Sequence, residues 1–248
     1  MIHTILLHFI LLTSFVHLQE TAATEADEAY RQGDYATAIE CYEAVLDKQC
    51  TSADLYYNLG NAYYRTDRMG LAILNYCRAL RLDPAMGDAR ENLALAESRT
   101  VDRITPLPKL FIVRWIDELC TRLTPAAWRV VWLVLLALVA LSVVTLRLGA
   151  SRNMRKTGLV AGVVCLLLLL MATWLMLRTS HRYNAHSEAV ILQPAVTVKG
   201  SPEQQSVDKL ILHEGTRVTV SDSLAGWYKI AIADGTTGWC SKTDLERI

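Results

Sequence analysis

Two long apolar runs constrain what this chain can fold into more than any other feature. They span residues 126–148 and 157–177, and their few charged residues lie near their ends. A helix of about 20 apolar residues crosses roughly 30 Å of hydrocarbon with all of its backbone hydrogen bonds made internally. The pair of runs therefore predicts a hairpin of two transmembrane helices.

The link between the runs, predicted as a loop over residues 149–156, is rich in basic residues. Four lie in or beside it, without an acidic residue: Arg147, Arg152, Arg155 and Lys156. Short loops with this density of positive charge stay in the cytoplasm. The parts of the chain before and after the hairpin are then expected on the opposite side of the membrane.

Aromatic and small residues add detail to the predicted hairpin. Indole side chains favour the membrane interface, and three lie near the end of the hairpin away from the basic link: Trp128, Trp132 and Trp174. Small residues allow close helix contact, and the candidate contact sets Gly158 and Gly162 against Ala137 and Ala140.

Composition and motifs exclude several classes of function. The chain has 248 residues, 52% hydrophobic, and a formal net charge of zero. Residues 24–100 carry 8 Lys/Arg against 13 Asp/Glu, so no soluble part offers the positive stripe that nucleic acid requires. No catalytic motif, metal-ligand spacing or phosphate loop occurs. We therefore expect neither an enzyme nor a protein with a cofactor or metal.

The six cysteines include no C-x-x-C pair. Cys41, Cys50 and Cys77 fall in one predicted helical region outside the cytoplasm. They are interpreted mainly as small buried hydrophobic residues, with one disulfide or thiol redox sensing as alternatives.

The first residues, 1–23, form a short apolar segment that is typical of a secretory signal peptide. An uncleaved membrane anchor is the alternative. With either a signal peptide or an anchor, the region that follows is expected to be exported.

Residues 24–99 contain an internal repeat with a period of 34 residues. Shifting the chain by 34 places Ala38 on Ala72 and Tyr42 on Tyr76, and this period is typical of a helix-turn-helix unit. The second copy, from Tyr56 to Pro84, resembles the tetratricopeptide repeat at nearly every signature position. We predict two repeats plus a capping helix. Because each repeat buries its apolar face only on its neighbours, we expect added support from the membrane-proximal helix or from a partner.

The resemblance implies a concave groove, lined by the first helix of each repeat, that binds peptides or extended protein segments. Carried over by position, its residues are Asp27, Tyr30, Tyr57, Asn61, Tyr64 and Asn92. Amide side chains suit a peptide backbone, and tyrosines supply rigid contact area. The alternative is that these residues serve only folding.

Residues 100–123 are predicted as a linker followed by an amphipathic helix. Apolar residues recur there at helical spacing. Such a helix is expected to lie in the membrane interface or to pack against the repeats.

After Arg178 the apolar period changes from 3.6 to 2. Five or six short strands with an Asp234–Gly235 turn are predicted, and they indicate a small barrel over residues 186–248. This region resembles the bacterial SH3-like domain of exported envelope proteins. Trp227 and Trp239 are assigned to the barrel core in preference to a ligand contact. His213, in a turn, is assigned no chemistry.

The complete order predicts a multi-domain, α-then-β protein: α-helical tetratricopeptide repeats, a two-helix transmembrane hairpin and a small C-terminal SH3-like β-barrel. This architecture resembles the BatE family of the Bacteroides aerotolerance (Bat) operon. The resemblance implies a periplasm-facing membrane protein that works with von Willebrand factor A-domain membrane proteins in an envelope or oxidative-stress role. The alternative is a tether or sensor that binds peptidoglycan through the SH3-like domain.

Overall fold

The computed structural model describes residues 24–47, 51–105, 107–108, 110–111, 113, 115–116, 125–184 and 187–248. It divides the chain into two compact units, residues 1–107 with 186–248, and residues 108–185. The first unit contains helices over residues 24–100, here called the repeat domain, and a sheet over residues 187–248, here called the sheet domain. The predicted α-then-β order is confirmed. The predicted signal peptide, Cys50 and most of the predicted amphipathic helix lie outside the described residues.

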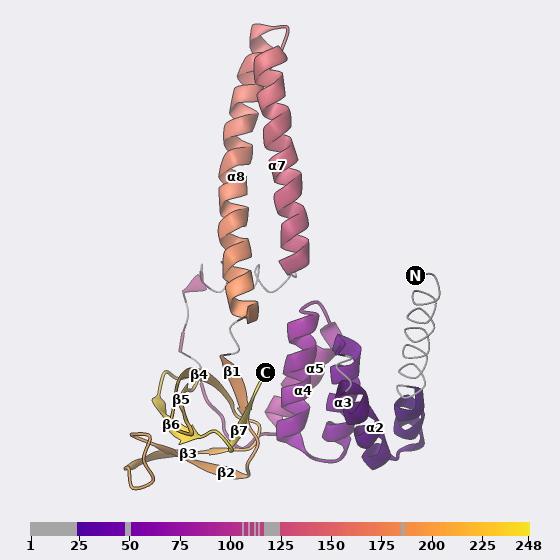
Figure 1. Cartoon of the computed structure of the whole chain (residues 1–248), viewed down its shortest axis with the longest axis vertical. Coiled ribbons are helices and arrows are strands. Elements are labelled where there is room, and N and C mark those ends of the chain that lie inside the picture. Colours follow the sequence, from indigo (N-terminus) through magenta and orange to yellow (C-terminus); the bar gives the residue numbers. More distant parts are fainter. Residues whose placement is uncertain are drawn as a thin grey trace, which may run out of the picture. The chain divides into compact units, whose positions relative to one another are not determined.

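The repeat domain is a row of helices joined by short turns (Figure 1). A helix over residues 24–32 is followed by α2 (Tyr35–Asp47), α3 (Ala53–Arg65), α4 (Met69–Leu82) and α5 (Gly87–Ser98). Local chemistry sets two of the boundaries. Ser52 caps α3, because its hydroxyl accepts a hydrogen bond from the Leu55 amide at 3.1 Å. Gly33 ends the first helix with a φ of 82°, a left-handed conformation that glycine adopts without strain.

The close crossing of α3 and α4 depends on a glycine. A Cβ atom at Gly60 would lie 2.8 Å from two ring carbons of Tyr76. The neighbouring Leu59, Ala72 and Tyr76 are buried. The small residue lets the two helices approach until the tyrosine ring fills the space between them.

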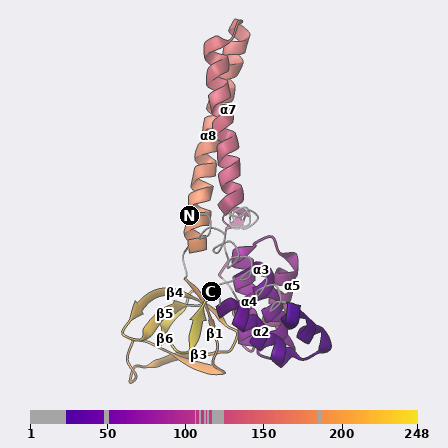
Figure 2. The same cartoon turned by 45° about the vertical axis from the view of Figure 1, so that its right-hand side comes forward.

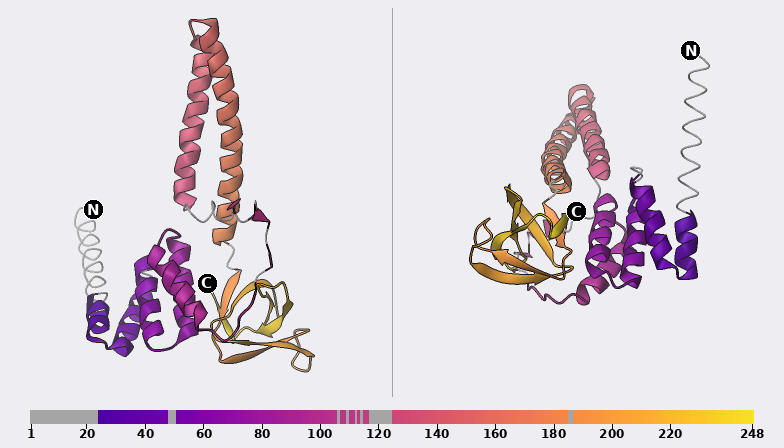
Figure 3. Two further views of the ribbon diagram at one scale, coloured as in Figure 1. Left: turned by 180° about the vertical axis from the view of Figure 1, so that it is seen from behind. Right: turned by 60° about the horizontal axis from the view of Figure 1, so that its bottom comes forward.

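The sheet domain is one open antiparallel sheet (Figure 3). Its strands are β1 (Glu188–Ile191), β2 (Ala195–Lys199), β3 (Asp208–His213), β4 (Arg217–Leu224), β5 (Trp227–Ala231), β6 (Thr237–Ser241) and β7 (Leu245–Arg247). The order across the sheet is β3-β2-β6-β5-β4-β1-β7. The predicted barrel is not confirmed, since β3 and β7 form two unpaired ends. The pattern of alternation also missed β7, which is only three residues long.

The core of the sheet domain excludes both tryptophans. Alternate residues of the strands, including Val198, Ile230 and Cys240, are buried on one face. Trp239 pairs with Lys229 across β5 and β6, and both belong to the other set of alternate residues. Trp227 is also only half-buried. The assignment of Trp227 and Trp239 to the core was wrong, because a period of two identifies two faces without saying which one is buried.

The sheet domain also completes the core of the repeat domain. Val190 of β1 is fully buried among the apolar side chains of the repeats, and Leu192 and Ile248 pack against the same cluster. After α5 of the third repeat, the described residues 101–105 and 107–108 form no second helix. The sheet domain therefore supports the repeat array, a contribution that the sequence did not predict. Support from the membrane-proximal helix or from a partner stays a prediction, since most of that helix lies outside the described residues.

Described residues just after α5, in the predicted linker, contact the sheet domain. Ile104 packs against its core, and the Leu107 amide donates a hydrogen bond to the Ala233 carbonyl at 3.1 Å. Asp102 accepts hydrogen bonds from the His213 amide (2.7 Å), His213 Nδ1 (2.7 Å) and the Thr216 hydroxyl (2.6 Å). His213 thus has a partner that the sequence did not reveal.

The second unit is built on two long apolar helices, α7 (Pro125–Leu148) and α8 (Arg152–Asn184), which lie side by side (Figure 2). Each contains a span long and apolar enough to cross a membrane, and only 6% and 11% of these spans are buried. The Ser151 hydroxyl accepts a hydrogen bond from the Met154 amide at 3.2 Å and so caps α8. Arg152, Arg155 and Lys156 therefore lie in the first turns of α8, and not in a loop.

Small and hydroxyl residues form the contact between α7 and α8. A Cβ at Gly158 would lie 2.5 Å from Thr145 Oγ1, and one at Gly162 would lie 2.9 Å from Ser142 Oγ. Ala137 and Ala140, the partners suggested by the sequence, are exposed. The glycine face was identified correctly, but its partner was not, since spacing along one helix does not fix the register of the other.

Candidate partner-binding groove

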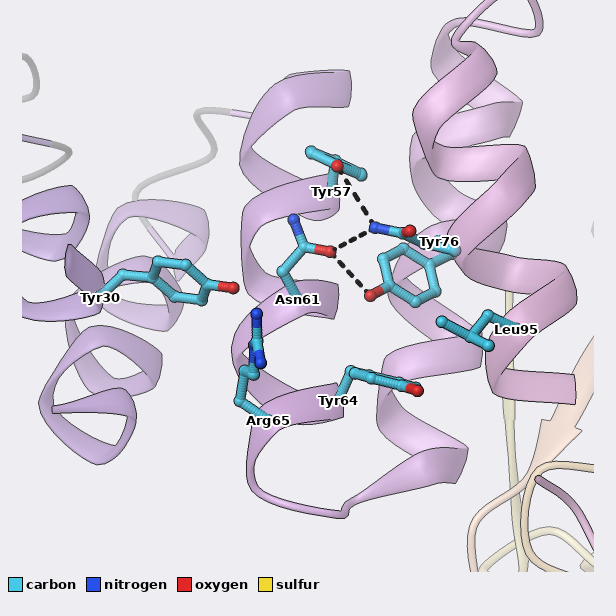
Figure 4. A pocket seen from close by; sticks show the side chains of 8 residues that line it. Tyr30, Tyr57, Asn61, Tyr64, Arg65, Tyr76 and Leu95 are labelled. Atoms are coloured by element: carbon cyan, nitrogen blue, oxygen red, sulfur yellow. Dashed lines mark hydrogen bonds between the residues drawn. The ribbon is translucent and has the colours of Figure 1, made fainter. Parts of the chain in front are cut away.

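One face of α3 carries Tyr57, Asn61 and Tyr64. Spacings of four and three residues return these side chains to the same side of the helix, and Figure 4 shows them facing the same space as Tyr30. The space is a groove of about 400 Å³, here called the tyrosine groove. It is lined by Tyr30, Tyr57, Asn61, Tyr64, Arg65, Tyr76, Asn92 and Leu95.

Five of the six residues predicted for a groove line this one: Tyr30, Tyr57, Asn61, Tyr64 and Asn92. Asp27 lies instead in a smaller pocket of about 160 Å³, which shares Tyr30 with the tyrosine groove. Its carboxylate accepts hydrogen bonds from the Tyr42 hydroxyl at 2.5 Å and from Asn58 Nδ2 at 3.4 Å. Asp27 is therefore already engaged in joining three helices of the repeat domain.

The floor of the groove is a hydrogen-bonded set of side chains from three helices (Figure 4). Asn61 Oδ1 accepts hydrogen bonds from the Tyr76 hydroxyl at 2.8 Å and from Asn92 Nδ2 at 2.9 Å. Asn92 Nδ2 also lies 3.3 Å from the Tyr57 hydroxyl oxygen. Burial raises the pKa of Tyr76 above its ordinary value, so its hydroxyl stays protonated and donates.

This arrangement leaves one donor and one acceptor free in the floor. In the described part of the chain, neither Asn61 Nδ2 nor Asn92 Oδ1 has a hydrogen-bond partner. An amide nitrogen and an amide oxygen together match the carbonyl and N–H groups of an extended peptide. The groove is therefore chemically complementary to a polypeptide backbone.

The walls of the groove are aromatic. The rings of Tyr57 and Tyr76 lie 6.1 Å apart and are tilted by 46°. Arg99 lies 5.2 Å from the centre of the Tyr64 ring and stacks on it. These contacts hold the tyrosines in place before any ligand arrives.

Sequence reasoning missed Arg65, Tyr76 and Leu95 as lining residues. Arg65 follows Asn61 by four residues and Leu95 follows Asn92 by three, so helical spacing carried the signal for both. Tyr76 comes from a second helix of a repeat and reaches the floor between neighbouring helices. Arg65 is the one formally charged residue among those that line the groove.

The described residues form neither a metal site nor a strongly nucleophilic thiol at Cys77. No group of three or more His, Cys, Asp or Glu residues there could hold a metal ion. Cys41 and Cys77 are free thiols. Burial raises the pKa of Cys77 to about 11, against the opposing effect of nearby Arg217, so this thiol is poorly nucleophilic at neutral pH.

Comparison with known proteins agrees with the helical architecture. Residues 24–87 match the family described as Tetratricopeptide repeat. The chain is also 34% identical over 83 residues to the Superkiller complex protein 3 of Homo sapiens. That match covers 31% of this chain and 5% of the human protein. The chain thus contains tetratricopeptide repeats, a module that generally mediates contacts with protein partners.

Proposed function

We propose that this protein is a membrane-anchored scaffold that holds an extended segment of a protein partner in the tyrosine groove. The observation that carries the proposal is the pairing of fixed tyrosine walls with a free amide donor and acceptor in the floor. An extended segment satisfies Asn61 Nδ2 and Asn92 Oδ1 with its backbone and covers the rings with its side chains.

The tyrosines are suited to bear much of the binding energy. Tyrosine gives a large contact area for the loss of few rotamers, and truncation of such an anchor in a binding site typically costs about 2 kcal/mol or more. Tyr30, Tyr57 and Tyr64 are half-buried before binding, so each still has surface to bury against a partner.

Two features support membrane anchoring through α7 and α8. Large apolar side chains along both helices are exposed, for example Leu133 (58%) and Leu167 (61%). Exposure of this extent in water favours aggregation, whereas lipid tails accommodate it. The basic residues at the tight turn between the helices favour the cytoplasm. The hairpin then lies in the cytoplasmic membrane, and the repeat and sheet domains face the periplasm.

The biological setting follows from the resemblance of the whole architecture to the BatE family. We propose a place in a Bat-type complex of the envelope, with a role in oxidative stress and with von Willebrand factor A-domain membrane proteins as partners. The tetratricopeptide repeats and the apolar hairpin support this setting in outline.

A crosslinked pull-down of the full-length protein from solubilised membranes tests the scaffold. Tyr57→Ala removes one wall. Asn61→Asp keeps an oxygen acceptor for Tyr76 and Asn92 but replaces the free amide donor with a second oxygen. We expect the native protein to recover a small set of membrane proteins. Both variants are expected to recover at least about tenfold less of them, which corresponds to a loss of about 1.4 kcal/mol in binding free energy.

Asp54→Asn, at the exposed start of α3, is the control and is expected to recover the native set. Unchanged recovery by both groove variants would reject the groove as the binding site. Protease treatment of spheroplasts tests the orientation: digestion of both soluble domains is expected, and protection of either one would contradict the proposed topology.

A second candidate function is peptidoglycan binding by the sheet domain. The observation that favours it is that Trp227 and Trp239 lie outside the buried core, on the face that also carries Lys229. Aromatic rings of this kind can stack on sugar rings. Full-length protein in detergent is expected to sediment with purified cell wall, and Trp239→Ala is expected to reduce the sedimented fraction. Absence of co-sedimentation would reject this function.

A further inference from the structure

Helix α5 belongs to two sites at once. Asn92 and Leu95 line the tyrosine groove, whereas the end of the same helix contacts the sheet domain. Glu97 Oε1 forms an ion pair with Arg217 Nε of β4 at 2.9 Å. Five residues of helix span only about 7.5 Å along the axis, so the groove wall and the interface are held by one short rigid element.

The contact between the repeat and sheet domains is made by several charged groups around an apolar centre. Glu214 Oε1 accepts a hydrogen bond from the Gly70 amide at 2.8 Å, close to the start of α4. Arg78 pairs with Glu246 at 2.5 Å. Val190 fills the apolar centre. The sheet domain thus covers a face of α4. In a longer repeat array, a further helix would cover this face.

Asp102 fixes the chain just beyond α5. Its side chain is only 13% exposed, and its three hydrogen bonds all come from the sheet domain, from His213 and Thr216. Thr100 lies beside Gly215, where a Cβ would come within 2.7 Å of Thr100 Cγ2. The C-terminal end of α5 is therefore clamped by the turn between β3 and β4.

Apart from this clamp, α5 is held by a limited set of contacts with α3 and α4. It has 12 residues, a length at which a helix is marginal in water by itself. Few of its side chains are buried: Ala89, Leu93 and Ala96. It lacks a side-chain cap at its N-terminus. Its stability therefore depends on what packs around it.

We infer that the tyrosine groove is complete only while the sheet domain is docked on the repeats, and that a segment bound in the groove strengthens that docking in return. The inference rests on the proposed role of the groove and adds its regulation. When the clamp opens, α5 frays and withdraws Asn92 and Leu95 from the groove. By linkage, any ligand that contacts these residues favours the docked state by the same factor. Occupancy of the groove is thereby coupled to the docking of the sheet domain, which follows α8 in the sequence.

Amide hydrogen exchange on the full-length protein in detergent micelles tests the inference without a partner. The variant Asp102→Ala removes the acceptor of three hydrogen bonds. We expect amides of α5, including those of residues 92–96, to exchange at least about tenfold faster, while those of α3 and β5 change by less than about twofold. Asp208→Ala, which removes an exposed ion pair with Lys199, is the matched control and should leave α5 unchanged.

Alkylation of Cys77 by N-ethylmaleimide, read by mass spectrometry of its peptide, gives a second measure. This thiol is buried on α4, 3.9 Å from Arg217 of the sheet domain. Asp102→Ala is expected to raise its labelling rate at least about tenfold. A variant with unchanged α5 exchange and unchanged Cys77 labelling would overturn the inference. Because neither readout uses a partner, failure here is distinct from failure of the pull-down, which tests the groove itself.

Discussion

Replacement of Gly60 by alanine is expected to destabilise the repeat domain, although alanine is the better helix former. The added Cβ would lie 2.8 Å from Tyr76 Cδ1 and Cε1. The ring cannot swing away easily, since it is 1% exposed and its hydroxyl is bonded to Asn61. Overpacking of this kind costs about 1–3 kcal/mol, against a gain of about 1 kcal/mol in helix propensity.

Gly87→Ala provides the matched comparison. Gly87 is the first residue of α5 in the repeat domain, and its added Cβ would meet no atom within 4 Å. Because Gly87 lies at a helix start, alanine gains no more there than at Gly60 in a helix interior. A lower stability of the Gly60 variant therefore reflects the overpacking, about 1–3 kcal/mol. Amide exchange of α4, which packs against both α3 and α5, measures this difference. Equal stability of the two variants would refute the account of the crossing.

Three further predictions concern the hairpin, the clamp and the thiols. Gly158→Leu is expected to separate α7 from α8, since even a Cβ would lie 2.5 Å from Thr145 Oγ1. Crosslinking between engineered cysteines on the two helices should fall, and unchanged crosslinking would contradict the packing. Burial raises the pKa of Asp102, but hydrogen bonds from Thr216 and His213 outweigh it, so its pKa lies below the ordinary 3.8. The clamp is then fully formed above about pH 3.8 and is lost as the pH falls through the lower folded value; α5 exchange, corrected for its intrinsic pH dependence, should rise only there, and a rise near pH 6 would count against this assignment. Burial raises the pKa of Cys77 to about 11 and of Cys240 to about 12, so both should resist N-ethylmaleimide at pH 8 until the protein unfolds, and rapid labelling of the native protein would show that they are not buried.

The sequence predicted the elements whose signals are local. The period of 34 residues located the helix pairs, and the resemblance to the tetratricopeptide repeat placed Gly60 and Tyr76 at their crossing. The five groove residues were found through the resemblance to the tetratricopeptide repeat. Spacings of three and four place only Tyr57, Asn61 and Tyr64 on one face of α3, whereas Tyr30 and Asn92 lie on other helices. The two apolar runs also carry a local signal. A long apolar stretch in a membrane leaves the backbone few ways other than a helix to satisfy its hydrogen bonds.

Contacts between distant segments could not be predicted in this way. Val190 is separated from the repeats by the whole hairpin, and its burial among them depends on complementary surfaces that no periodicity encodes. The same holds for the bonds of Asp102 to His213. Alternation gave most strands but not their order, so an open sheet was mistaken for a closed barrel. The engagement of Asp27 by Tyr42 was also hidden, because a position carried over from a repeat family does not reveal which neighbours already occupy its carboxylate.

Site-specific photocrosslinking in cells tests the central claim most directly. A photoreactive phenylalanine analogue placed at Tyr64, in the groove, is compared with one at Glu40, an exposed position on α2. The account predicts a discrete adduct with a membrane protein from position 64 and none from position 40. The same adducts from both positions, or none from position 64 while the protein is folded and inserted, would contradict a scaffold that binds its partner through the tyrosine groove.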